Sequence, residues 1–147
     1  MHEILWSRFA DIDNYTLYSL LRLRSEVFVV EQACAFVDLD GRDTIASTEH
    51  AWIPDEPASS DVLAGLRVFE DGPETVKISR VVTRPGLRGQ GLGDQLMKAA
   101  IVRYRGSAIV LDAQTRLVAW YERLGFAADG DRFLEDDILH TPMRYHP

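Results

Sequence analysis

Three glycines crowd into the segment Arg88–Gly93 of this chain, which reads RGQGLG. Apolar alternation before the segment predicts a strand over 74–83, and the helical spacing of apolar residues after it predicts a helix over 91–104. Glycine lets a backbone approach a ligand closely, and a helix N-terminus presents unpaired N–H groups and a positive dipole end. The segment therefore predicts a cradle for a diphosphate, to which Arg88 adds a planar fork of donors.

Other interpretations of this glycine segment stay open. It could be a flexible turn that merely leads into a helix. A mononucleotide P-loop needs a Gly-Lys pair, which the sequence lacks, and a dinucleotide fingerprint needs GxGxxG directly after its strand. Asp112 imitates the acid that binds a ribose in dinucleotide sites, but one strand–helix–strand unit supplies only half of that fold. A nucleotide-binding protein of unrelated chemistry is the remaining alternative.

The elements on either side of the segment predict an α+β fold. Strands are expected over 4–9, 48–53, 61–70, 74–83, 108–111 and 141–146, helices over 14–30, 91–104 and 117–124, and a loop over 31–47. Several antiparallel strands thus precede one strand–helix–strand unit, which predicts a mixed, largely antiparallel sheet flanked by helices. A length of 147 residues suits a single domain over 1–147.

Composition narrows the expected partners. Acidic residues outnumber basic ones by 23 to 16, and the net charge of −7 repels a phosphate backbone, so we expect no nucleic-acid binding. Apolar runs reach about five residues, too short to cross a membrane, and no signal peptide is visible. The single cysteine, Cys34, is expected to be a buried structural thiol in a reducing compartment, most simply the cytoplasm. Without CxxC or HExxH spacing, no metal site is expected.

Two motifs resemble those of the GNAT superfamily of N-acetyltransferases. The pattern Gln/Arg-x-x-Gly-x-Gly/Ala is met by Arg88, Gly91 and Gly93, and the strand before it stands where the family's acyl-CoA-binding strand stands. The stretch Ala119–Phe126, AWYERLGF, is similar to the family's second motif. Further stretches extend the likeness to the ElaA-like subgroup over most of the chain, namely Phe28–Gln32, Asp40–Asp43, His50 and Glu135–His140.

The resemblance implies acetyl-CoA as cosubstrate, held where two parallel strands splay apart, and a primary amine of a small molecule or peptide as acceptor. The residues implied in binding acetyl-CoA are Val81, Val82, Arg88, Gly89, Gln90, Gly91, Leu92, Gly93 and Gln114. Gln114 stands where many members carry an asparagine, and its longer amide can still donate. The backbone amide of Val82 is expected to stabilise the charge that develops on the thioester oxygen.

The same resemblance assigns catalytic roles. An amine with a pKa of about 10.4 is mostly protonated at pH 7, so the site must accept a proton. Tyr121 is similar to the family's general acid for the leaving thiolate, although its apolar helix stripe also suits a core aromatic. The expected bases are His50 and Glu31, and structural or surface roles stay open for them and for the further candidates Asp40, Asp43 and His140.

Together these features predict an enzyme that transfers an acetyl group directly, without a covalent enzyme intermediate. The alternative is a non-catalytic acyl-CoA-binding or sensing module that keeps the cradle and lacks a base. The sequence does not identify the acceptor, and it leaves a homodimer open.

Overall fold

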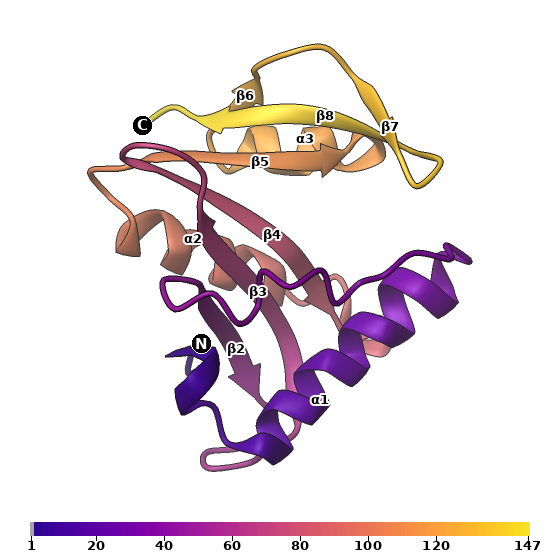
Figure 1. The fold of residues 1–147 in the computed structure, drawn as a ribbon, viewed down its shortest axis with the longest axis vertical. Helices are drawn as coiled ribbons and strands as arrows, with labels where there is room; N and C mark the ends of the chain where they lie inside the picture. Colours follow the sequence, from indigo (N-terminus) through magenta and orange to yellow (C-terminus); the bar gives the residue numbers. More distant parts are fainter. Residues whose placement is uncertain (1) are drawn as a thin grey trace.

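One eight-stranded sheet organises the computed structural model, which describes residues 2–147 (Figure 1). The strands lie in the order β1-β2-β3-β4-β5-β8-β6, and β7 pairs with β8 off this path. The β4–β5 pair is parallel and the other pairs are antiparallel. The predicted α+β fold with a mixed, largely antiparallel sheet is therefore confirmed.

The elements follow the order that the sequence predicts, with two additions. They are β1 (Leu5–Arg8), α1 (Asn14–Arg24), β2 (Glu49–Pro54), β3 (Val62–Glu70), β4 (Thr75–Thr83), α2 (Leu92–Arg103), β5 (Ala108–Gln114), α3 (Val118–Arg123), β6 (Phe126–Ala128), β7 (Phe133–Glu135) and β8 (Ile138–Tyr145). The short strands β6 and β7 were not predicted. Each has three residues and pairs only along β8, so neither carries enough alternation to be read from sequence.

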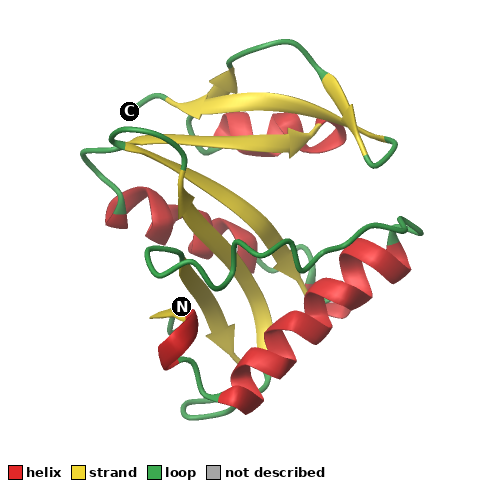
Figure 2. Ribbon diagram, viewed as in Figure 1, coloured by secondary structure: helices red, strands yellow, loops and turns green. Residues whose placement is uncertain are grey.

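Helices cover both faces of the sheet (Figure 2). On one face, Leu96, Met97 and Ala100 of α2 are fully buried in the main core with residues of β3, β4 and β5. On the other face, α1 packs its Leu20 and Leu23 into a second apolar cluster. The approach of α1 to the sheet is close, because a Cβ at Gly65 would lie 2.6 Å from Leu20 Cδ1. Glycine at this strand position is what lets α1 lie against β3.

The helix expected over 14–30 changes its winding part-way. A seven-residue π-helical segment, Ser25–Glu31, follows α1 directly. In it the Gln32 amide donates to the Val27 carbonyl five residues earlier, at 3.2 Å, and the wider turns end where Ala33 adopts a φ of +50°. Glu31, the last residue of this π-helical segment, contacts Arg88 of the glycine segment, and Gln32, which follows it, contacts Gln114 at the end of β5.

Candidate functional site

The strands β4 and β5 separate soon after they meet. Their parallel register joins Thr75–Lys77 to Ala108–Val110, and within residues 2–147 no further pair connects them. In Figure 1 the two strands touch at one end and diverge toward the other. A cleft of about 930 Å³ is lined by β4 and β5, the glycine segment and the end of α1's π-helical extension. The predicted splayed pair of parallel strands is therefore confirmed.

A bulge distorts β4 beside this cleft. Val82 pairs with Gly65 and Ser79 pairs with Arg67, so two residues of β4, Arg80 and Val81, oppose one residue of β3. Arg80 adopts a φ of +54°, a conformation that is uncommon outside glycine. Bulges of this kind redirect the backbone and are frequent beside active sites. Here the bulge takes Val81, which lines the cleft, out of the β3 register.

The glycine segment leaves its amides available. Among residues 2–147, the amides of Gly89, Gln90 and Gly91 find no acceptor, and Gly91 caps α2 without a side-chain hydrogen bond. Gly89 and Gly91 have φ of +80° and +82°, which glycine adopts without strain. The unpaired first turn of α2 follows them directly. The predicted anion cradle thus has free donors on the wall of the cleft.

Two members of the expected binding set have other surroundings. A Cβ at Gly93 would lie 3.2 Å from Trp120 Cζ2, so this glycine lets α2 pack against α3. Trp120 Nε1 donates to Asp94 Oδ1 at 2.6 Å and joins the same two helices. Gln90 does not line the cleft and faces a separate hollow with Arg84. At both positions only the backbone can meet a ligand in the cleft, because Gly93 has no side chain and Gln90 does not line the cleft.

Glu31 and Arg88 lie together at the edge of the cleft. Arg88 donates from Nη1 to Glu31 Oε2 at 2.8 Å and from Nη2 to Oε1 at 2.5 Å. The hydrogen bond from Arg88 holds the pKa of the Glu31 carboxyl below its usual range. A carboxylate with a lowered pKa accepts protons poorly, and Glu31 itself does not line the cleft. Both facts argue against the expected role of Glu31 as a base.

Tyr121 stands on α3 and lines the cleft. Only 7% of the residue is exposed, and its ring meets Trp120 and Phe126 edge-on, with centroids 4.7 and 6.1 Å away. Burial raises the pKa of the Tyr121 phenol, because a phenolate loses its hydration in this setting. The hydroxyl therefore stays protonated at neutral pH, as a proton donor must.

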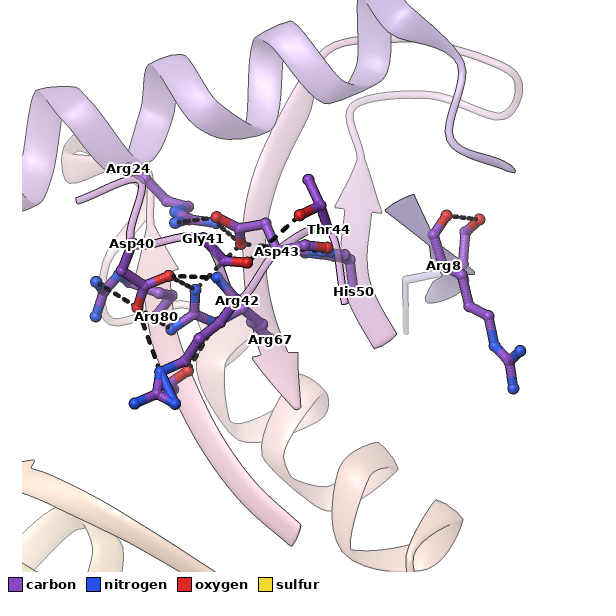
Figure 3. Close-up of polar contacts among 12 residues, drawn as sticks. Arg8, Arg24, Asp40, Gly41, Arg42, Asp43, Thr44, His50, Arg67 and Arg80 are labelled. Atoms are coloured by element: carbon purple, nitrogen blue, oxygen red, sulfur yellow. Dashed lines mark hydrogen bonds and ion pairs between the residues drawn. The ribbon is translucent and has the colours of Figure 1, made fainter. Parts of the chain in front are cut away.

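His50 lies away from the cleft. It is fully buried on β2, and its Nε2 lies 3.2 Å from the carbonyl of Asp43, which that nitrogen can reach as a donor (Figure 3). Burial lowers the pKa of His50, so the imidazole is neutral at pH 7. Because no substrate in the cleft could touch it, the expected role of His50 as a catalytic base is not supported by its position.

A largely buried ion-pair network lies beside His50, which adjoins it at Asp43 (Figure 3). It combines three arginines with three aspartates from α1, β3, β4 and the loop after the π-helical segment: Arg24, Arg67, Arg80, Asp38, Asp40 and Asp43. Arg24 and Arg67 are each about 1% exposed, and both bind Asp43. Asp40 and Asp43, expected as candidate bases in a surface loop, instead serve as acceptors for arginine. The network ties that loop to the bulge at Arg80.

These buried arginines were missed by the sequence reasoning. The signal was available in β3, where Arg67 interrupts the otherwise apolar run Val62–Phe69. A charged side chain at such a position has to be paired when it is buried. The acidic cluster at Asp38–Asp43 is the partner that the sequence offered.

Contacts between distant segments close one end of the cleft. Gln114 Nε2 donates to Gln32 Oε1 at 3.2 Å, which joins β5 to the π-helical segment. Cys34 Sγ donates to the carbonyl of Asp136 at 3.3 Å, and burial raises the pKa of this free thiol. The prediction that Cys34 is buried is confirmed. His140 lines the same end, where its Nδ1 lies 2.8 Å from the Ile138 carbonyl.

The donors present fit a coenzyme A molecule. Free amides and Arg88 suit a diphosphate, and the slot between β4 and β5 suits an extended amide-bearing arm. In residues 2–147, His, Cys, Asp and Glu form no group of three that could hold a metal ion. In the same range, no helix has the length and apolar character needed to span a bilayer.

Known proteins are similar to this chain in sequence and in fold. The family described as "Acetyltransferase (GNAT) domain" matches residues 45–147. ElaA of Escherichia coli is 36% identical over 135 residues, which covers 86% of this chain and 85% of ElaA. This chain belongs to the GNAT family. A UPF0039 protein of Mycobacterium tuberculosis is 43% identical over 142 residues, 95% of this chain and 88% of that protein.

Solved structures place the chain in the ElaA-like branch of GNAT proteins. E. coli ElaA superposes with a TM-score of 0.89 at 30% identity, over 99% of this chain and 100% of ElaA. An acyl-CoA N-acyltransferase from Pseudomonas aeruginosa gives a TM-score of 0.88 at 39% identity, over 99% and 100% of the two chains. As a GNAT acyltransferase, this chain uses an acyl-CoA as its acyl donor.

Proposed function

We propose that this GNAT protein transfers an acetyl group from acetyl-CoA to a primary amine of a small molecule or peptide, by direct attack. The observation that carries the proposal is the row of free amides at Gly89–Gly91, which follows β4 at the end where β4 and β5 are no longer paired. Acetyl-CoA, when bound, supplies a thioester whose acyl carbon an amine can attack. The whole of 1–147 acts as one N-acetyltransferase domain in this proposal.

Two parts of the cofactor are bound by different groups at the C-terminal end of β4. The amides of Gly89, Gln90 and Gly91 bind the diphosphate together with the first turn of α2, which begins at Leu92 and Gly93. Arg88 adds its guanidinium once Glu31 releases it. Val81 and Val82 line the slot for the arm, and Gln114 lies at its far wall.

The amide that stabilises the thioester oxygen is that of Val81 in this proposal, rather than that of Val82. Val82 keeps its register with Gly65, whereas the bulge at Arg80 takes Val81 out of the ladder. A backbone donor already fixed toward developing charge lowers the barrier without reorganisation. Holding this donor in place is the role that we assign to the bulge.

Tyr121 protonates the leaving sulfur, and His140 accepts the proton of the amine. The Nδ1 of His140, at 2.8 Å from a carbonyl, must carry the ring hydrogen of the neutral imidazole. Its Nε2 therefore has a free lone pair and can serve as a base. Of the five bases that the sequence offered, His140 alone lines the cleft without an ion-pair partner in the described chain.

The acetyl group, the amine acceptor and the cytoplasmic location each rest on a separate observation. Acetyl is the group named by the matching family. An amine fits the acidic residues Glu135 and Asp136 on the cleft wall, which favour a cation. A single unpaired cysteine fits a reducing compartment such as the cytoplasm.

Release of free thiol tests the proposal directly. The chain is mixed with acetyl-CoA and a panel of primary amines, and we expect amine-dependent release of CoA thiol. Thermal shift assays with CoA, NAD and ATP compare the binding of the three ligands. Of these, we expect only CoA to raise Tm. CoA binding without thiol release from any amine would favour the non-catalytic acyl-CoA sensor.

A further inference from the structure

The chain contains two lysines, Lys77 and Lys98, and one of them lies inside the cleft. Lys77 is the last residue of β4 that pairs with β5, so it marks the apex at which the strands separate. Its Nζ lies 2.7 Å from Oδ2 of Asp112 on β5, and about a quarter of each side chain is exposed. Lys98 is exposed on α2 and does not line the cleft.

Lys77 lines the same cleft as Val81, whose amide binds the thioester oxygen in the proposed function. Val76 and Ile78 are buried, so the side chain of Lys77 stands on the opposite face of β4, with Ser79. In the proposed function, the diphosphate lies at Arg88–Gly93, beyond the other end of β4. An arm that enters there and runs along β4 brings its thioester to Val81, four residues from Lys77, with the acyl group directed toward the apex.

We propose that Lys77 is a self-acylation site, modified by the acyl-CoA bound in the same cleft. Resting on the proposed function, the step is an ordinary acyl transfer with an internal amine as acceptor. The Nζ–C amide bond forms, the C–S bond of the thioester breaks, CoA leaves as the thiol, and the proton lost from the ammonium passes to solvent. Acylated Lys77 is neutral, so the carboxylate of Asp112 loses its ion-pair partner.

Peptide mapping after incubation with acetyl-CoA alone tests this proposal. Trypsin does not cleave after an acetylated lysine, so modification of Lys77 yields the single peptide Val68–Arg80 in place of two fragments. Lys98 is the internal control, because spontaneous acetylation in solution favours the more exposed amine. We expect Lys77 to be labelled about tenfold faster than Lys98, since a bound thioester has a high effective concentration.

Competition and substitution complete the test. Excess CoA should suppress labelling of Lys77 and leave that of Lys98 unchanged. The Lys98→Arg chain should keep the Val68–Arg80 product, and the Lys77→Arg chain should yield no acetylated form of it. Labelling of Lys77 no faster than Lys98, or labelling that CoA does not suppress, overturns the proposal. Failure of the proposed function looks different, since CoA would then raise no Tm and no amine would release thiol.

Discussion

Glu31 occupies both donors of the Arg88 fork, at 2.8 and 2.5 Å. The arginine that suits a diphosphate is thus already paired with a carboxylate from the π-helical segment. A diphosphate entering the cradle competes with this carboxylate for the same guanidinium. The ion pair is partly exposed, with side-chain exposures of 46% for Arg88 and 39% for Glu31, so the competition is modest.

Glu31→Gln should tighten the binding of CoA. Because exposed ion pairs contribute little, we expect a decrease in Kd of about fivefold at most. Titration calorimetry with CoA measures the change. Glu26→Gln is the matched control. It removes the same charge from the same segment, but Glu26 pairs with Arg22 and not with Arg88. Equal effects of the two variants would mean that net charge alone, and not release of Arg88, changes affinity.

Tyr121→Phe should lower kcat and leave the Kd for CoA unchanged. Loss of a positioned general acid reduces turnover by about 10²–10⁴-fold, while phenylalanine keeps the ring contacts with Trp120 and Phe126. Single-turnover thiol release and CoA titration give the two quantities. Turnover equal to that of the parent chain would leave Tyr121 as a core aromatic with no part in proton transfer.

His140→Ala should lower kcat, and imidazole added to the buffer should restore part of it. The restored activity reports a base, since a merely structural histidine would not respond to a free imidazole. His50→Gln is the contrasting variant, for which we expect kcat within about twofold and reduced stability, because His50 is fully buried. A kcat loss confined to His50→Gln would reverse our assignment of the two histidines.

Gly93→Ala should destabilise the fold by about 1–3 kcal/mol, the range of overpacked positions. Its new Cβ would lie 3.2 and 3.3 Å from two ring atoms of Trp120, which Asp94 holds in place. Gly86→Ala is the control, because a Cβ there meets nothing within 4 Å. Urea unfolding compares the two, and equal midpoints would show that Trp120 moves aside freely.

Protonation of Asp40 should lower the free energy of unfolding at acid pH. Burial raises its pKa, but hydrogen bonds from the Arg67 side chain and the Arg42 amide outweigh this and lower the pKa from 3.8 to about 2. The folded state therefore holds the proton less readily than the unfolded chain. The stabilisation is complete above about pH 4 and is lost as the pH falls through about 2.

The comparison that isolates this effect uses Asp40→Asn. The difference in unfolding free energy between the parent chain and the variant should be constant near neutral pH. The difference should shrink as the pH falls from about 4 to 2, because the aspartate of the parent chain becomes protonated and, like asparagine, loses its charge. Urea midpoints across this range measure the difference. A gap that stays the same down to pH 2 would remove Asp40 from the acid response.

Much of the fold could be predicted because its signals are local. The alternation in β3 and β4 and the helical spacing around Leu96 depend only on neighbouring residues in the chain. The order of strand, loop and helix around Arg88–Gly93 predicted the position of the glycine segment between β4 and α2. The π-helical segment could not be predicted in this way. Its apolar spacing resembles an α-helix, and only the shift of hydrogen bonds from four to five residues distinguishes the two.

The site was harder to predict than the fold, because its residues meet across the chain. Arg88 and Glu31 are 57 residues apart, and Gln114 and Gln32 are 82 apart. The sequence correctly predicted that His50 lies on a strand. Strand alternation does not predict which face of that strand borders a cleft and which is buried against ion pairs. The ion-pair network around Asp43 depends on the loop after the π-helical segment, whose path no periodic pattern specifies.

The strand β8 pairs with β5, β6 and β7 and is thus the shared partner of a whole half of the sheet. During synthesis β5 must wait, with one edge unsatisfied, until residues 138–145 emerge from the ribosome. The half of the sheet that holds β1–β4 can assemble earlier, because these strands pair antiparallel in chain order. A nascent chain stalled before β8 would accordingly have β4 and the glycine segment folded, while β5, the other side of the cleft, still lacked its β8 partner.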